Sequence, residues 1–208
     1  MKSAKDDFAS RFDVSRETME RLEIYATLLR KWTKRINLVA PGTVDVLWER
    51  HFTDSAQILT LAPQAATKWV DLGSGGGFPG AVVALMASAT RPDFIMTLIE
   101  SDQRKATFLR AVVRETDTKL NVLAKRAEAA NPSHADIVTA RALAPLERLL
   151  GYVSHHICEK GIALLPKGAN ASSEVELARK TWSFTCESIP SMTDNQAAIL
   201  KIGDIKRV

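Results

Sequence analysis

The sequence is poor in cysteine: Cys158 and Cys186 are the two that occur in 208 residues, too few for a disulfide framework. It has no uninterrupted apolar run of membrane-spanning length, and its first residues lack the apolar core of a signal peptide. Repeats, low-complexity tracts and long linkers are also missing. We therefore expect a reduced, cytoplasmic protein without a membrane partner, formed by one domain or by one domain with an appendage.

Strong charge and metal-binding clusters are scarce as well. The 28 Lys and Arg against 24 Asp and Glu give a net charge of +4, a mild excess that fits a polyanionic partner without establishing one. His155, His156 and Cys158 lie close together, but no second cluster supplies the remaining ligands of a closed zinc site. We therefore expect no metal ion.

The pattern of apolar residues changes near Pro63, and the part before it is predicted to be helical throughout. Ser15 is a plausible N-cap of the first long helix. Apolar residues then recur at intervals of three and four positions, namely Leu22, Tyr25, Leu29, Trp32 and Ile36. After a turn at Pro41-Gly42, a second helical region spans about 44–61.

From Lys68 onward, strands and helices alternate. The expected strands are Trp69–Leu72, Phe94–Glu100, Leu120–Ala124, Ala135–Ala140, Gly161–Pro166, Trp182–Ile189 and Ala197–Ile202. Such alternation is typical of a parallel sheet covered by helices on both faces, and the last two strands would form an antiparallel hairpin at its edge. We predict an α/β, doubly wound, Rossmann-like fold with seven strands, the last antiparallel, in residues 64–208. Residues 1–63 would form a helical extension packed on it.

A glycine cluster follows the first expected strand, in the segment Asp-Leu-Gly-Ser-Gly-Gly-Gly-Phe-Pro-Gly at 71–80. A strand, a glycine turn and a helix together bring bare backbone against a small molecule. Residues 75–80 match the G-x-G-x-x-G pattern of nicotinamide dinucleotide sites, and Glu100 lies where an acidic partner of a ribose belongs. A nicotinamide cofactor is therefore one of two candidate ligands, and a glycine turn that binds no ligand is the least favoured of the three interpretations.

S-adenosylmethionine is the other candidate, and we rank it first. The glycine directly after the strand is Gly73, which gives the frame Gly73-x-Gly75-x-Gly77 instead. The carboxylate of Asp71 would repel a pyrophosphate but attract a cationic ammonium and sulfonium, at roughly 4 kcal/mol for a partly screened pair.

Ligands of doubly wound sheets bind at the carboxyl ends of the strands, so the residues that follow each strand are candidates. Glu100 would bond the adenosine ribose, or it would cap the next helix. Ala127 and Glu128 would meet the adenine edge, although an acid there also suits the start of a short helix. Arg141 would contact a carboxylate, a phosphate or a nearby acid such as Asp71, with a structural ion pair as the alternative.

Several motifs occur in order along nearly the whole chain. They are 32–38 (Trp-Thr-Lys-Arg-Ile-Asn-Leu), Arg50-His51-x-x-Asp54-Ser55, 71–80, Glu100-Ser101 with Arg104-Lys105, Arg141-Ala142 and Lys167-Gly168. With them the chain resembles the RsmG (glucose-inhibited division protein B) family. The pattern departs from that family at Thr33, Gly76 and Phe78, where Asn, Pro and Leu are common.

The resemblance implies a class I methyltransferase that uses S-adenosyl-L-methionine to methylate N7 of one guanine, guanine 527, in bacterial 16S rRNA. Its partner would be 16S rRNA or the 30S subunit, and we expect a monomer. The expected cofactor contacts are Asp71, Gly73, Gly75, Gly77, Phe78, Glu100, Ala127, Glu128 and Arg141. Arg141 is also the candidate catalytic residue. The candidate RNA contacts are Lys34, Arg35, Arg50, Arg104, Lys105 and Lys167.

Missing motifs fit a reaction at N7. The N7 atom of guanine carries a lone pair and no proton, so methyl transfer to it needs no general base. Neither cysteine follows a proline, as the nucleophile of pyrimidine C5 enzymes usually does. The segment 140–145 also lacks the Asn/Asp-Pro-Pro-aromatic loop that exocyclic-amine enzymes favour.

His51 and Asp54 are three positions apart on a predicted helix and would form a buried hydrogen-bonded pair that holds the helical extension to the sheet. A catalytic histidine is less favoured because no proton has to be removed. Two alternatives to the methyltransferase stay open. One is a nicotinamide-dependent oxidoreductase, and the other is a catalytically silent RNA-binding protein of the same fold.

Overall fold

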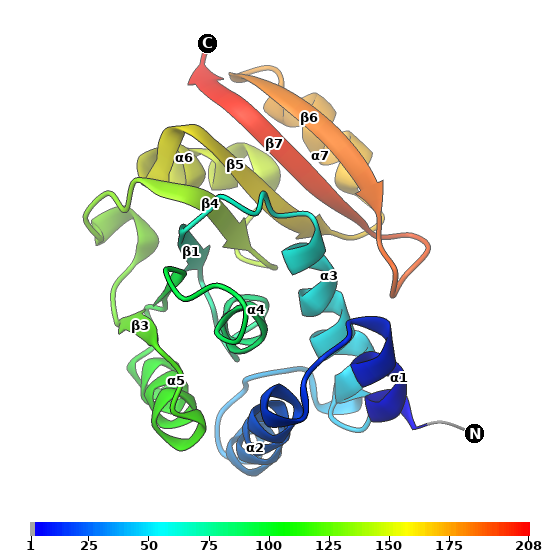
Figure 1. The fold of residues 1–208 in the computed structure, drawn as a ribbon. Helices are drawn as coiled ribbons and strands as arrows, with labels where there is room; N and C mark the ends of the chain where they lie inside the picture. Colours follow the sequence, from blue (N-terminus) through cyan, green and yellow to red (C-terminus); the bar gives the residue numbers. More distant parts are fainter. Residues whose placement is uncertain (1–2) are drawn as a thin grey trace.

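The computed structural model describes residues 3–208, and within them seven strands form one sheet. The strands are β1 (Lys68–Leu72), β2 (Ile95–Ile99), β3 (Leu120–Leu123), β4 (Ala135–Ala140), β5 (Ile157–Lys167), β6 (Trp182–Pro190) and β7 (Ala198–Arg207). Their order across the sheet is β3-β2-β1-β4-β5-β7-β6 (Figure 1). Neighbours from β3 to β5 pair in parallel, whereas β7 is antiparallel to both β5 and β6. The predicted doubly wound sheet with an antiparallel last strand is confirmed.

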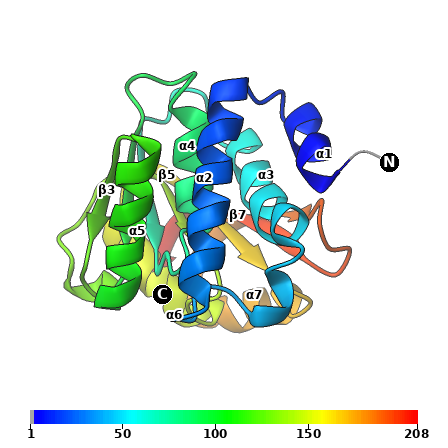
Figure 2. The same ribbon diagram turned by 90° about the horizontal axis from the view of Figure 1, so that it is seen from below.

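Helices cover both faces of the sheet. They are α1 (Ala4–Arg11), α2 (Arg16–Thr33), α3 (Asp54–Thr60), α4 (Gly80–Ala87), α5 (Gln103–Thr116), α6 (Leu146–His156) and α7 (Ala171–Ala178). Helices α2 to α5 lie on one face, and α6 and α7 lie on the other (Figures 1 and 2). Because side chains alternate along a strand, Ile137 of β4 joins the first apolar cluster and Val138 joins the second.

The N-terminal helices differ in detail from the prediction. Ser15 caps α2 by accepting a hydrogen bond from the Thr18 N–H, as expected. Helix α1 precedes it, in the part of the chain that was expected to be helical, although no bounds were predicted for a helix before Ser15; Ser3 and Asp6 form a capping box at its start. The turn expected at Pro41-Gly42 is a 3-10 turn, η1 (Pro41–Thr43), and the second helical region after it divides into a π-helix η2 (Trp48–Thr53) and α3.

The N-terminal helices share one apolar cluster with the sheet. Tyr25 and Leu29 of α2 belong to the same cluster as Phe78, Leu109 and Leu164. The division of the chain at residue 63 stays a prediction. Among the described residues, no helix is long and apolar enough to cross a bilayer.

Two boundaries were predicted too narrowly. Strand β5 begins at Ile157, directly after α6, whereas the sequence indicated a start at Gly161. The extra length is possible because the pairing with β4 shifts register between Ala135 and Ile137, as at a β-bulge. Strand β7 likewise extends to Arg207, beyond the predicted end at Ile202.

Candidate active site

The glycine loop links β1 to α4 at the carboxyl edge of the sheet. Its positive φ angles are at Gly73, Gly75 and Gly77, with values of 65°, 56° and 95°. Gly76 and Gly80 do not have positive φ in the described chain. The turn therefore follows the frame Gly73-x-Gly75-x-Gly77, which the sequence analysis preferred to the dinucleotide frame.

Asp71 lies under this loop and is fully buried. Its Oδ1 accepts a hydrogen bond from Thr139 Oγ1 at 2.7 Å, and its Oδ2 accepts one from the Gly80 N–H at 3.3 Å. Burial raises the pKa of Asp71 to about 6, while hydrogen bonds from Thr139, Ser74 and Gly80 act in the opposite direction. Asp71 thus fastens the end of the loop to the sheet, and its predicted cofactor contact stays a prediction.

Glu100 holds the other side of the loop. Its Oε2 accepts a hydrogen bond from the Gly75 N–H at 2.8 Å, and its Oε1 accepts one from the Asp102 N–H at 2.8 Å. Asp102 in turn caps α5 with its own side chain. Glu100 therefore connects the loop to the turn before α5, and its proposed bond to a ribose is not tested.

The helical extension also contacts the glycine loop. The hydroxyl of Tyr25, on α2, donates a hydrogen bond to the Gly76 carbonyl. Burial raises the pKa of Tyr25 well above its usual value, so the hydroxyl keeps the proton that it donates. The Phe78 ring stacks on Tyr25 at 5.5 Å and on His51 at 4.9 Å between centroids. Sequence analysis placed Tyr25 only in the helix core, because the periodicity of α2 carries no sign of a loop partner.

Arg141 joins the end of β4 to the helical extension. Its Nη1 donates to Asp54 Oδ2 at 3.1 Å, and its Nη2 donates to His51 Nδ1 at 3.0 Å. The guanidinium also lies over the Phe78 ring, 5.1 Å from its centroid. The predicted hydrogen-bonded pair of His51 and Asp54 is wrong: within residues 3–208 no hydrogen bond joins the two side chains, and both bind Arg141 instead. The acid that contacts Arg141 is Asp54, whereas the sequence analysis suggested Asp71.

The hydrogen bonds of His51 define its protonation. Thr43 Oγ1 donates to the Ala40 carbonyl at 2.8 Å, so it accepts from His51 Nε2 at 2.7 Å. Nδ1 then carries the lone pair that accepts from Arg141. Burial, together with the cations Arg141 and Arg50, lowers the pKa of His51 to about 4. His51 is therefore neutral at physiological pH, and both of its nitrogens are engaged.

Two hollows meet at the segment after β4. The smaller, about 210 Å³, is lined by Gly73, Ala127 and Glu128 among others. The larger, about 800 Å³, contains Arg141, His51 and Asp54 together with residues from the ends of β5 and β7. Leu143 and Ala144 line both hollows, and Leu143 lies against Gly73, where an added Cβ would be 2.6 Å from its Cδ1.

The predicted cofactor residues divide between these places. Three of them line the smaller hollow and Arg141 lines the larger. The others, which in the described structure line neither hollow, are Asp71, Gly75, Gly77, Phe78 and Glu100. Leu143 was missed, because it is one more apolar residue in the sequence until the fold places it on the loop.

The predicted RNA-binding cations are not equivalent. Lys34 and Arg35 are exposed at the end of α2, close to residues that line the larger hollow. Arg50 and Arg104 are exposed but paired with Asp194 and Asp102, and Lys105 is half-buried. The Lys167 side chain is only 10% exposed and forms an ion pair with Glu174 at 2.7 Å, which sequence analysis did not predict.

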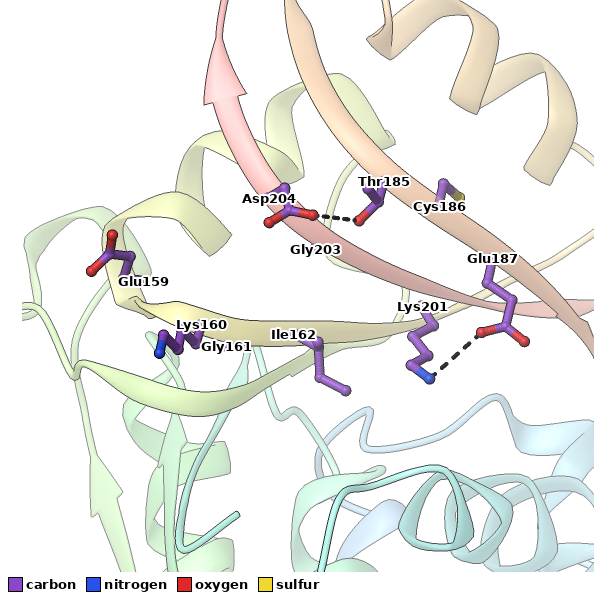
Figure 3. Close-up of a pocket in the computed structure, with 10 residues that line it drawn as sticks. All are labelled: Glu159, Lys160, Gly161, Ile162, Thr185, Cys186, Glu187, Lys201, Gly203 and Asp204. Atoms are coloured by element: carbon purple, nitrogen blue, oxygen red, sulfur yellow. Dashed lines mark hydrogen bonds and ion pairs between the residues drawn. The ribbon is translucent and has the colours of Figure 1, made fainter. Parts of the chain in front are cut away.

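A further hollow of about 530 Å³ lies on the outer strands β5, β7 and β6, away from the glycine loop (Figure 3). Its polar groups pair with one another: Lys201 with Glu187 at 3.5 Å, and Thr185 with Asp204 at 3.2 Å. Among the described residues, no group of three or more His, Cys, Asp or Glu comes together as a metal site would require. We assign no site to this hollow.

Comparison with known proteins identifies the family. A family model described as rRNA small subunit methyltransferase G matches residues 18–200. The chain belongs to this family. It is 48% identical over 196 residues to the "Ribosomal RNA small subunit methyltransferase G" of Ruegeria sp. (strain TM1040), covering 94% of this chain and 95% of that protein. The protein of the same name from Paramagnetospirillum magneticum is 48% identical over 202 residues, covering 97% and 96%.

Solved structures show the same fold at low identity. The TYW2 protein of M. jannaschii, in complex with AdoMet, superposes with a TM-score of 0.54 and 9% identity, covering 85% of this chain and 80% of that one. The predicted Rossmann-like methyltransferase fold is thereby confirmed, and the resemblance to the RsmG family is confirmed by the family match.

The contact between Tyr25 and the glycine loop, called the clamp below, predicts that Gly77→Ala strongly lowers the stability of the protein. A side chain at φ of 95° is strained, and its Cβ would lie 2.5 Å from the Tyr25 hydroxyl. We expect the free energy of unfolding, measured by urea titration, to fall by about 1–3 kcal/mol. Gly42→Ala is the control, because nothing lies within 4 Å of its added Cβ. Equal stability of the two variants would contradict the clamp.

The lowered pKa of His51 predicts a pH-dependent stability. Between 6.5 and about 4, the unfolded chain binds a proton at His51 and the folded chain does not, so stability falls as the pH drops through this window. His51→Asn lacks this titration and keeps an acceptor for Arg141. Urea titrations at both ends of the window should therefore show the wild type losing stability relative to the variant at the acidic end. The opposite slope from Asp71 is common to both proteins and cancels. A stability difference between the two proteins that does not change with pH would contradict a neutral His51 in the folded protein.

Proposed function

We propose that this chain transfers a methyl group from S-adenosylmethionine to N7 of a single guanine, guanine 527, of bacterial 16S rRNA. The observation that carries the proposal is the pair of hollows that meet at Leu143, directly above the glycine loop. Membership of the family over residues 18–200 supports the chemistry and the class of acceptor. The substrate is the free rRNA or the 30S subunit that contains it.

The smaller hollow suits the cofactor. When bound, S-adenosylmethionine supplies an electrophilic methyl group on a positively charged sulfur. Gly73 presents bare backbone to this hollow, and Ala127 and Glu128 border it at the end of β3, where an adenine would lie. Gly75 offers a second open position, because the nearest atom to an added Cβ there is 3.8 Å away. The buried carboxyl of Asp71 beneath the loop favours a cation over a pyrophosphate in this place.

The larger hollow suits the guanine. The lone pair of N7 forms the new N–C bond, and the electron pair of the breaking C–S bond stays on sulfur. The positive charge passes to the guanine, and no proton has to leave. The neutral, fully engaged His51 fits this scheme, because the site then acts by positioning and electrostatics without a general base.

Arg141, which lines the larger hollow, is the proposed contact to the acceptor. Two of its N–H groups are held by Asp54 and His51, which leaves a fixed guanidinium beside the larger hollow. A guanidinium in this position is suited to an RNA phosphate or a cofactor carboxylate. The exposed Lys34, Arg35 and Arg104 would add phosphate contacts around the same edge.

We expect Arg141→Ala to abolish methyl transfer. Purified wild type should incorporate labelled methyl from S-adenosylmethionine into 16S rRNA or 30S subunits, and digestion should recover the label as N7-methylguanosine. The variant loses the fixed cation, so its kcat/KM should fall by roughly 100-fold or more. Arg114→Ala, at the exposed far end of α5, is the matched control and should keep wild-type activity.

Thermal unfolding shows whether the Arg141 variant is still folded. A folded Arg141→Ala protein with full activity would remove this residue from the site. Wild-type label recovered at any other atom than guanine N7 would refute the proposed reaction.

A further inference from the structure

Methylation at N7 restricts how the enzyme can recognise its guanine. The commonest protein contact to guanine is a bidentate bond to O6 and N7, which would cover the reacting atom. The opposite edge of guanine carries two neighbouring donors, N1–H and the 2-amino group. Adenine has an acceptor at N1 in the same place. An ionised carboxylate, which only accepts hydrogen bonds, therefore separates the two purines at this edge.

Three carboxylates line the larger hollow: Asp54, Glu174 and Asp194. Both oxygens of Asp54 and both oxygens of Asp194 already accept hydrogen bonds from the protein. The donors are Arg141, Thr193 and Gln57 for Asp54, and Arg50 and the Gln196 N–H for Asp194. Neither side chain therefore has an oxygen that is free of bonds from the described residues.

Glu174, on α7, differs from both. Its Oε2 accepts from the Leu146 N–H at 2.7 Å and from Lys167 Nζ at 2.7 Å. Within residues 3–208, no donor contacts its Oε1, and the side chain is 26% exposed. One oxygen thus fixes the carboxylate at the start of α6, while the other keeps both of its acceptor sites.

Lys167 also sets the position of Glu174 relative to the two hollows. Lys167 Nζ donates to Glu174 and, at 3.0 Å, to the carbonyl of Ala144, the residue that lines both hollows with Leu143. A single ammonium group therefore bridges the Glu174 carboxylate and the Ala144 carbonyl, in the segment where the two hollows meet. We propose that Oε1 of Glu174 accepts N1–H and the 2-amino group of the target guanine, which makes Glu174 a specificity-determining residue. This inference rests on the proposed function.

The same contact would assist the reaction. As N7 acquires the methyl group, the guanine ring becomes positively charged and its N1–H becomes a stronger donor. A carboxylate fixed at this edge then binds the transition state more strongly than the substrate. Lys167 does not contact the base in this arrangement, and its task is to orient Glu174.

The test exchanges Glu174 for glutamine and compares rRNA carrying guanine or adenine at the target position. Lys167 and the Leu146 N–H require an acceptor, so the amide oxygen takes the place of Oε2 and the NH₂ group takes the place of Oε1. Glu174→Gln should therefore lower kcat/KM on guanine by roughly 10- to 100-fold, the loss expected for a bond to a charged acceptor. Its selectivity for guanine over adenine should shrink, because the amide donates to adenine N1. Glu176→Gln, exposed on the same helix, should behave as wild type.

A measurement on the wild type makes the test independent of the variant's folding. Inosine keeps N7 and N1–H but lacks the 2-amino group, so rRNA with inosine at the target should be methylated about tenfold less efficiently. Equal rates on guanine and inosine, or an unchanged guanine-to-adenine ratio in a folded Glu174→Gln protein, would overturn the assignment of Glu174 alone. A wild type that does not methylate the guanine would instead overturn the proposed function.

Discussion

The guanidinium of Arg141 is the contact on which the rest of the site depends. It leaves the end of β4 and binds Asp54 and His51, two residues of the helical extension that lie far from it in sequence. Because all three side chains are largely shielded from water, loss of one partner would leave the others without their bonds. The extension is thereby fixed to the edge of the sheet where the hollows open.

Because Arg141 fixes the extension to the sheet, the glycine loop is held by contacts on two sides and has little conformational freedom. Asp71 and Glu100 bind its N–H groups from the sheet side, and Tyr25 binds its Gly76 carbonyl from the extension. The Phe78 ring lies between Tyr25, His51 and the Arg141 guanidinium. A loop that is fixed from both sides loses little further freedom when a ligand binds to it, which is the advantage of a preorganised site.

Local patterns allowed much of the fold to be predicted, whereas the contacts of the site could not be. The Ser15 cap, the alternation after Lys68 and the final hairpin follow from spacing and turn residues, which act over a few positions. Which glycines form the turn was predictable, because Gly73 directly follows the end of β1 and the others come at every second position after it. The partner of Arg141 and the partner of Lys167 depend on which strand ends become neighbours, and no local pattern carries that information. Helix α1 lies in the part that was expected to be helical, but its bounds were not predicted although the residues of its capping box, Ser3 and Asp6, were present in the sequence.

In the proposed reaction, the smaller hollow holds the cofactor, the larger holds the acceptor, and one guanine of the small-subunit rRNA is methylated at N7. Base-resolution mapping of N7-methylguanosine in 16S rRNA tests it most directly, in cells with this chain, without it, and with its Arg141→Ala variant. The account predicts one modified guanine that is present only with the wild-type chain. An unchanged modification pattern in all three strains would contradict it.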